Sequence, residues 1–291
     1  MKTLPGHVAF IGAGYVSLEF AFLANAAGSR VTILGCGRPL AAFDETLVDR
    51  LLDHARSLGI DVRLGSPVTG VERAGHSGRF RIAVAGGAQA PDDADLVVHG
   101  AGRIPNTAKL ALAAGQVLAD PRGAIEVNEY LQSVSNPRVY AAGDVVLPPG
   151  AMPLTPVAAH HGAVVASNLL KGNSARADYR GIPSVVFTLP PLASVGLTEA
   201  EARRRTLDVR VETGDTTGWF SNRHVREPVG MFKTIIDSST DRMLGAHLLG
   251  RHAAETINAF ALAVRFGLTA RDLRHAIYSY PTATSDLPYM V

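Results

Sequence analysis

The start of the chain alternates apolar runs and glycine breaks in the manner of a nucleotide-binding α/β unit. An apolar run at 7–11 precedes Gly12-Ala13-Gly14, an apolar-periodic stretch continues to Ala27, and a second β-rich run covers 30–34. A strand, a glycine turn, a helix and a second strand within about thirty residues are the context that a phosphate-binding turn requires. The pattern predicts a dinucleotide on this turn, with a purely structural glycine turn as the alternative.

Each small residue of the turn has an expected task. Gly12 permits the tight turn, and Gly14 lets the backbone approach a diphosphate on the positive end of the following helix. Ser17 stands at the third position, where a small residue allows close packing of helix on strand. After the second strand no acid is present to bind a ribose 2′-hydroxyl, and the nearest charge is Arg38, which would pair with a 2′-phosphate. The sequence therefore favours NADP(H) over NAD(H), unless Arg38 points into solvent.

The pattern predicts two further groups of elements, divided near residue 180. The first group comprises a helix over 39–60, a strand over 61–64, short strands of an antiparallel meander within 68–75, 78–86 and 94–107, and an apolar strand over 138–142. The second group comprises strands over 184–191, 207–215, 230–237 and 243–250 and an amphipathic helix over 252–267. The change from mixed elements to consecutive strands indicates more than one domain.

Composition narrows the class of protein. The 291 residues are 47% hydrophobic and 19% charged, as in an ordinary well-packed protein. A net charge of +2 argues against a nucleic-acid binder, and no segment has the length and apolarity of a membrane span. Cys36 is the single cysteine, so the chain cannot form an internal disulfide, a dithiol redox pair or a cysteine-based metal site. We expect a cytoplasmic protein with no metal.

Six segments carry the most specific pattern in the chain. In order they are GAGYVSLEFA, GAGRIPNT, VYAAGDVV, LTPVAAHHGAVVASNLL, IPSVVFTLPPLASVGLTEAEA, and GMFKTIID followed by MLGAHLLG. Together they resemble the pyridine nucleotide-disulfide oxidoreductases, a family of flavoproteins that includes glutathione reductase, over essentially the whole chain.

The resemblance implies an α/β fold, with a Rossmann-like NAD(P)-binding domain and an α+β dimer-interface domain. It assigns 1–118 to NAD(P)H binding, 119–178 to the C-terminal part of an FAD-binding domain, and 179–291 to dimerisation. It implies FAD together with NADP(H) or NAD(H) as cofactors, small-molecule substrates, and a homodimer without nucleic-acid or membrane partners.

The resemblance also assigns residues to the nicotinamide cofactor. Tyr15 corresponds to a tyrosine whose ring covers the nicotinamide pocket, and Glu19 to a carboxylate near the nicotinamide end with a catalytic role. Val16, Gly102 and Arg103 would line the same cleft. The alternatives are that Tyr15 is ordinary surface packing and that Glu19 is an acid of the first helical turn, favoured by the helix dipole.

The flavin residues follow from the same resemblance. Asp144 would hydrogen-bond the ribitol–phosphate region of FAD, Leu154 and Thr155 would face its isoalloxazine ring, and Val185 would also contact cofactor. Without the family, Asp144 after Gly143 is equally a turn acid or a helix N-cap.

The chain departs from the family pattern at both ends. Family members open with a further domain that carries the ADP half of the FAD site and a CxxxxC redox pair, so we expect an N-terminally truncated member. At the other end the family has a His–Glu acid/base pair, whereas Tyr280 and Ser285 stand at these positions and Asp286 follows one residue late. Tyr280 is the catalytic candidate, although a phenol is a poor base at neutral pH. His275 is nearby in sequence but is expected on a helix.

The sequence therefore predicts an FAD-dependent NAD(P)H oxidoreductase that passes hydride from NAD(P)H to flavin, and electrons on to a disulfide or another acceptor. The alternative is a catalytically incompetent module that binds NAD(P) and dimerises.

Overall fold

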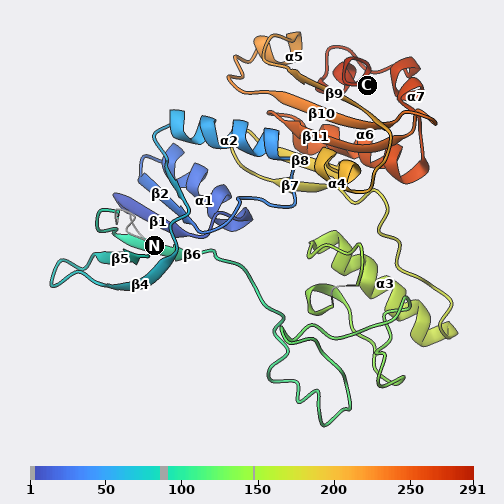
Figure 1. Ribbon diagram of the computed structural model, residues 1–291, viewed down its shortest axis with the longest axis horizontal. Coiled ribbons are helices and arrows are strands. Elements are labelled where there is room, and N and C mark those ends of the chain that lie inside the picture. The colour runs from blue at the N-terminus through green and yellow to red at the C-terminus, as the bar shows by residue number, and fades with distance from the viewer. Residues whose placement is uncertain (1–3, 86–90, 147) are drawn as a thin grey trace. The chain divides into compact units, whose positions relative to one another are not determined.

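The structure is a computed structural model that describes residues 4–85, 91–146 and 148–291 (Figure 1). Gly86, the last residue of one predicted strand, and Met1 lie outside the described residues. The chain divides into two compact units: unit 1 comprises Met1–Gly102 and Gly181–Val291, and unit 2 comprises Arg103–Arg180. The functional boundaries at 118 and 178 stay predictions. Throughout the described ranges, no helix has both the length and the apolar character needed to cross a membrane.

The first half of unit 1 is a parallel sheet with helices. Its strands are β1 (His7–Ile11), β2 (Arg30–Gly35), β3 (Asp61–Leu64) and β6 (Leu96–His99), in the order β3-β2-β1-β6 with every pairing parallel. The helices are α1 (Tyr15–Ala26) and α2 (Glu45–Ser57). Phe10, Leu18, Ile33 and Leu51 are almost fully buried between sheet and helices. This is the predicted Rossmann-like arrangement.

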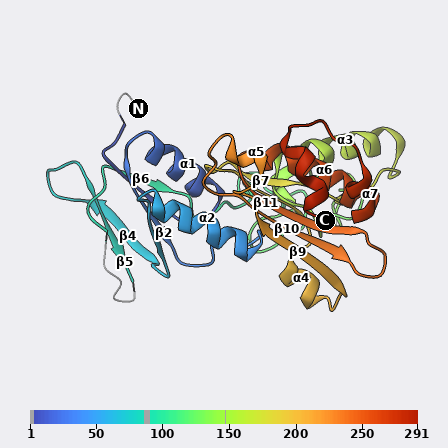
Figure 2. The ribbon, with the colours of Figure 1, turned by 90° about the horizontal axis from the view of Figure 1, so that it is seen from above.

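Two predictions for this half need correction. The expected meander is a two-stranded hairpin of β4 (Val68–Arg73) and β5 (Phe80–Val84), which lie side by side in Figure 2. The third segment is not part of it, because β6 pairs in parallel with β1 instead. The helix predicted over 39–60 begins only at Glu45. Asp44 is its N-cap, whose carboxylate accepts the Thr46 N–H at 3.1 Å, and Leu40 has a left-handed φ of 45° that no helix continues through.

The second half of unit 1 is an antiparallel sheet with helices on it. The strands are β7 (Ser184–Val186), β8 (Leu192–Gly196), β9 (Val209–Asp215), β10 (Met231–Asp237) and β11 (Met243–Leu249), in the order β7-β8-β11-β10-β9. The helices are α4 (Glu199–Arg204), α5 (Phe220–Arg223), α6 (Ala253–Phe266), α7 (Ala270–His275) and the 3-10 helix η2 (Ala283–Tyr289). The strand predicted over 184–191 stops at Val186, and β8 is a strand that the sequence pattern did not predict.

A buried charge cluster joins the two halves of unit 1. Lys233 on β10 is 5% exposed, and its ammonium lies 3.0 Å from an oxygen of Asp44 and 3.0 Å from one of Glu199. It also donates to the Thr46 hydroxyl at 2.9 Å. Since a buried ammonium without partners is very costly, these bonds fix the start of α2 against the second sheet, along which α2 lies in Figure 1.

Unit 2 has little regular structure. Its helices are η1, a 3-10 turn at Gly143–Val145, and α3 (Thr155–Lys171). Val117, Ile125, Leu131, Val146 and Val164 form its small core. The strand predicted over 138–142 is wrong: within this range Tyr140 makes one isolated bridge, to Gln132, and no regular ladder forms.

Candidate functional site

The glycine turn after β1 has the backbone that a phosphate-binding turn requires. Gly12 has a φ of +98°, and its N–H donates to the carbonyl oxygen of Leu34 at 2.8 Å. A Cβ at this position would lie 2.6 Å from the carbonyl oxygen of Gly100, so only glycine fits. Gly14 has an ordinary φ of −93°, and the nearest atom to its Cβ position is 4.0 Å away. Gly12 is therefore needed for the turn itself, and Gly14 leaves open space beside it.

The start of α1 presents free backbone donors to this space. Gly14 is the N-cap, and no side chain in the described ranges caps the helix there. Ser17 is fully buried, and its side chain fills the place that a Cβ of Gly100 would take. The Ser17 hydroxyl has no hydrogen-bond partner among the described residues. Uncapped N–H groups at the positive end of a helix suit an anionic group. The residues present fit the diphosphate of a dinucleotide.

Tyr15 and Glu19 connect α1 to the segment that contains β7. The Tyr15 hydroxyl is 2.6 Å from the Ser184 hydroxyl, and its ring meets that of Phe43 edge-on at 5.6 Å. Burial raises the pKa of Tyr15, so it stays a neutral phenol. The Glu19 carboxylate accepts the N–H of Phe187 at 2.9 Å. Glu19 is the fifth residue of α1, so the alternative that it is a first-turn acid is wrong.

Five further residues predicted to contact a cofactor lie on different parts of the chain. Val16 is on the exposed side of α1, and Val185 is half-buried on β7 between two residues that pack inward. Gly102, with a φ of +113°, is the last residue of the first stretch of unit 1. Arg38 follows β2 and pairs with Glu45 at 3.3 Å, both side chains being exposed. The last residue, Arg103, belongs to unit 2.

In unit 2 the predicted flavin residues lie on η1 and at the start of α3. Asp144, in the middle of η1, is half-exposed, and a guanidinium nitrogen of Arg103 lies 3.6 Å from its carboxylate. Leu154 is the N-cap of α3 and Thr155 its first residue, and no described side chain caps this end. A carboxylate beside open helix N–H groups offers both an acceptor and donors. These residues fit the polar part of a flavin nucleotide.

Sequence reasoning missed the residue that holds η1. His161 on α3 is 1% exposed, and its Nδ1 accepts the N–H of Gly143 at 3.2 Å. Its Nε2 lies 2.8 Å from the hydroxyl of Tyr179. The available signal was a pair of histidines, His160 and His161, inside an otherwise small and apolar stretch of helix.

The C-terminal candidates surround a hollow of about 350 Å³ in the second half of unit 1. Tyr280 is 77% exposed at this hollow and stacks on Phe220 at 6.2 Å between ring centroids. Ser285 is not paired with Tyr280, because its hydroxyl donates to the carbonyl oxygen of Thr282 at 2.6 Å within the cap of η2. Tyr280 and Ser285, which stand at the positions of the family's acid/base pair, are therefore not bonded to each other.

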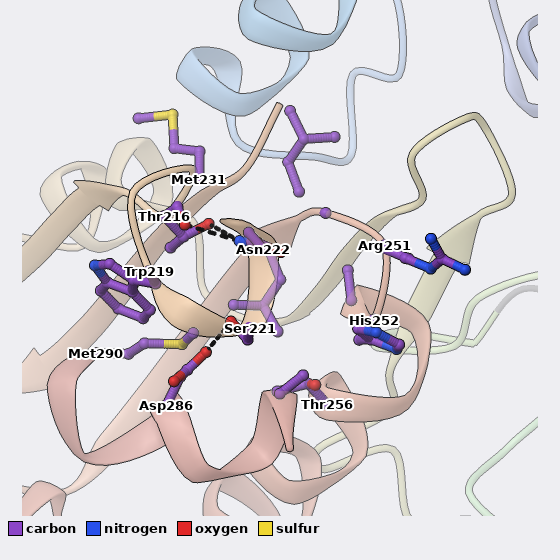
Figure 3. A pocket seen from close by; sticks show the side chains of 15 residues that line it. Thr216, Trp219, Ser221, Asn222, Met231, Arg251, His252, Thr256, Asp286 and Met290 are labelled. Carbon is purple, nitrogen blue, oxygen red and sulfur yellow. Dashed lines mark hydrogen bonds between the residues drawn. The ribbon is translucent and has the colours of Figure 1, made fainter. Parts of the chain in front are cut away.

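Asp286 is bonded differently from Ser285. Its carboxylate accepts a short hydrogen bond from the hydroxyl of Ser221 in a smaller hollow of about 40 Å³ beside the first (Figure 3). Burial raises the pKa of Asp286. His275 is an exposed residue at the end of α7, as expected.

Comparison with known proteins identifies the family. The sequence profile described as pyridine nucleotide-disulphide oxidoreductase matches residues 1–162, and that of the dimerisation domain of the same family matches residues 182–291. The chain belongs to the pyridine nucleotide-disulphide oxidoreductases. The predicted family and fold class are thereby confirmed, and oxidoreductases of this family are flavoprotein enzymes.

Three curated relatives illustrate what this chain is similar to. A glutathione reductase of Burkholderia cepacia is 35% identical over 97% of the chain, which spans 61% of that protein. A 19.7 kDa uncharacterized protein of a mercuric resistance operon in Staphylococcus aureus is 49% identical over 57% of the chain and 92% of its own length. The chain also spans only 52% of a mercuric reductase from the same organism. It therefore covers about half to two-thirds of the curated reductases it matches.

A solved structure gives the same fold. The Cu(II) complex of the HOCl-induced flavoprotein disulfide reductase RclA from Escherichia coli superposes with a TM-score of 0.89 at 30% identity. The match covers all of this chain and 64% of that one. The arrangement of a parallel sheet and an antiparallel sheet is thus shared with a flavoprotein disulfide reductase.

Proposed function

We propose that this chain provides the nicotinamide-cofactor site, part of the flavin site and the dimerisation domain of an FAD-dependent NAD(P)H oxidoreductase. The observation that carries the proposal is the start of α1: Gly12 forces the turn, Gly14 leaves space, and the uncapped N–H groups point at that space. Bound FAD would take hydride from NAD(P)H and pass electrons to a disulfide or another acceptor.

The chain's own residues have separate tasks in this proposal. The turn and the start of α1 bind the diphosphate, and Arg38 exchanges Glu45 for the 2′-phosphate of NADP(H). Tyr15 and Glu19, each bonded to the β7 segment, line the nicotinamide end and limit water there. In unit 2 the carboxylate of Asp144 and the start of α3 bind the flavin nucleotide.

The proposal includes a homodimer through the second half of unit 1. Several large apolar side chains are exposed there: Phe220 56%, Ile277 100%, Tyr280 77% and Tyr289 74%. An obligate interface of such side chains buries roughly 2,000 Å² or more. In this dimer Tyr280 would donate a proton at the acceptor, because the Ser285 hydroxyl is engaged in the η2 cap.

A second candidate function rests on the cysteine count. With Cys36 alone and exposed, this chain cannot supply a dithiol that accepts electrons from flavin. The alternative is therefore a module that binds NAD(P) and dimerises without catalysing disulfide reduction.

Titration of the purified chain with NADPH and NADH, with light scattering at micromolar concentration, tests what the two candidates share. We expect NADPH to bind more tightly than NADH and the chain to be a dimer. Failure of both nucleotides to bind, with the fold intact by circular dichroism, would refute both functions. Turnover of a quinone with added FAD and NADPH then selects the enzyme, and binding without turnover selects the module; glutathione disulfide should not be reduced in either case, because the chain has a single cysteine.

A further inference from the structure

His161 has a protonation state that its partners define. The backbone N–H of Gly143 can only donate, so Nδ1, 3.2 Å away, carries no proton. The proton is then on Nε2, which donates to the Tyr179 hydroxyl at 2.8 Å. The rings of His161 and Tyr179 meet edge-on at 5.6 Å, which holds the imidazole plane in this orientation.

The groups around His161 favour this neutral form. Burial lowers the pKa of His161, and the neighbouring His160 lowers it further. His160 is itself bonded through Nε2 to the N–H of Asp178 at 3.1 Å. Burial raises the pKa of Tyr179, so its hydroxyl stays protonated. The charges nearest on the η1 side, Asp144 and Arg103, are paired with each other.

The turn η1 is anchored at both of its ends. At the far end the N–H of Ile125 donates to the carbonyl oxygen of Val145 at 2.8 Å. At the near end the anchor is the side chain of His161, which accepts the N–H of Gly143, a glycine whose φ of +79° lies in the left-handed region that other residues rarely adopt. Asp144 lies between these anchors, so the direction of its carboxylate depends on both.

We propose that His161 is a positioning residue of the flavin site: its Nε2–H imidazole fixes Gly143 and thereby aims the Asp144 carboxylate at the flavin nucleotide. This inference rests on the proposed function, because Asp144 is assigned there to flavin binding. A protonated imidazole would set two N–H groups against each other and release the turn. The residue therefore acts through Gly143 and does not itself contact flavin.

Four variants of the full chain separate positioning from simple packing. His161→Asn retains an acceptor near the place of Nδ1 but cannot titrate, whereas His161→Phe retains a ring without any acceptor. Tyr179→Phe removes the partner of Nε2 and leaves the bond to Gly143. His76→Asn, at an exposed loop position, is the matched histidine control. Circular dichroism of each variant checks that α3 still forms.

Three readouts are needed. Nitrogen-15 NMR at pH 7.5 reports which ring nitrogen of His161 carries the proton, and amide exchange reports the protection of the Gly143 N–H. Flavin fluorescence gives the dissociation constant of FAD. We expect NMR to show the Nε2–H form of His161 in the unchanged chain. His161→Phe should lose about tenfold in both Gly143 protection and FAD affinity, because it removes one buried hydrogen bond. His161→Asn should recover part of both.

The outcomes are distinct. A protonated Nδ1, or Gly143 protection that is the same in His161→Phe as in the unchanged chain, overturns the inference. FAD affinity that is equal in His161→Phe and His76→Asn also overturns it. If FAD binds to no variant, the proposed function fails, and the Gly143 exchange result alone decides whether His161 positions the turn.

Discussion

Two glycine turns of this chain stand beside uncapped helix starts, and they are held in different ways. The turn at Gly12 runs directly into α1, and backbone bonds hold it: Gly12 N–H to Leu34 and Gly100 N–H to Ile11, both at 2.8 Å. The turn at Gly143 is separated from α3 by residues 146–154, and a side chain of α3 holds its first residue.

The difference shows what each turn demands of the sequence. The first needs glycine because a Cβ at Gly12 would lie 2.6 Å from the carbonyl oxygen of Gly100. Such a glycine can be recognised from the residues next to it, because it stands between a strand and a helix. The second needs one histidine eighteen residues further along, in the correct tautomer. A glycine turn beside a helix start can therefore be held by backbone bonds alone or by a long-range side-chain contact.

The largest expected effect comes from adding one methyl group to each turn. Gly12→Ala combines a φ of +98° with a clash against the Gly100 carbonyl oxygen, and we expect it to lower the free energy of unfolding by about 3 kcal/mol or more. Gly143→Ala has a φ of +79° but meets only Ala158 at an ordinary 3.5 Å, so strain alone should cost about 1–2 kcal/mol. Urea denaturation of both variants measures the difference.

The control for this pair is Gly37→Ala. Gly37 is exposed, has no atom within 4 Å of its Cβ position, and lacks a left-handed φ. Its substitution should change stability by less than about 0.5 kcal/mol. Equal losses for Gly12→Ala and Gly143→Ala would contradict the claim that close backbone approach distinguishes the two turns.

A second prediction separates the effect on folding stability from the effect on nucleotide affinity at the first turn. Gly14→Ala adds a Cβ that is 4.0 Å from its nearest neighbour, so stability should change little. The same Cβ occupies the space that the diphosphate must approach, and NADPH affinity should fall about thirtyfold, or about 2 kcal/mol. Isothermal titration and urea denaturation of one sample test both statements. Unchanged affinity would mean that the diphosphate lies elsewhere.

Elements whose signals are local could be predicted from the sequence. The strand at 7–11 and the glycine turn follow from a short apolar run and its break, and the structure has both at these places, as it has the strand predicted at 61–64. The start of α2 was placed too early, because residues 39–43 are apolar enough to continue the helical pattern. The turn in which Phe43 N–H bonds to Leu40 and the cap at Asp44 decide the boundary instead.

Features that depend on distant partners could not be predicted. Lys233 is an ordinary residue of a predicted strand in the sequence, and nothing local indicates that it is buried. Its ion-pair partner in the core, Asp44, lies 189 positions earlier in the chain. His161 has no motif of its own, and the sequence does not show that Ser285, at the family's glutamate position, bonds to the Thr282 carbonyl oxygen in the cap of η2. The strand expected over 138–142 was wrong because apolar composition does not reveal whether a neighbouring strand exists.

A third prediction tests how the first site discriminates between nucleotides. Arg38 and Glu45 are both exposed, and such an ion pair contributes little net stability, so the guanidinium can exchange Glu45 for a 2′-phosphate. Arg38→Ala should weaken NADPH binding by about 1–2 kcal/mol, the strength of a charged hydrogen bond, and leave NADH binding unchanged. Parallel titrations measure this. Tighter binding of NADH to the unchanged chain would refute the preference, and Glu45→Gln is the control that leaves the guanidinium in place.

The smallest expected effect is a loss of amide protection at Gly143, in the second turn, as the pH is lowered. The folded-state pKa of His161 is below its ordinary value of 6.5 because the ring is buried, whereas in the unfolded chain it titrates near that value. As the pH falls below about 6.5, His161 gains a proton in the unfolded state but not yet in the folded state. The stabilisation by neutral His161 is therefore complete above about pH 6.5 and decreases as the pH falls toward the folded-state pKa. Gly12 is held by backbone groups that do not titrate.

Amide exchange, corrected for intrinsic rates, should therefore show Gly143 losing protection between pH 7.5 and 5.5 before Gly12 does, and His161→Asn should remove the difference. Equal loss at both glycines in the unchanged chain would locate the acid response in another group of the protein.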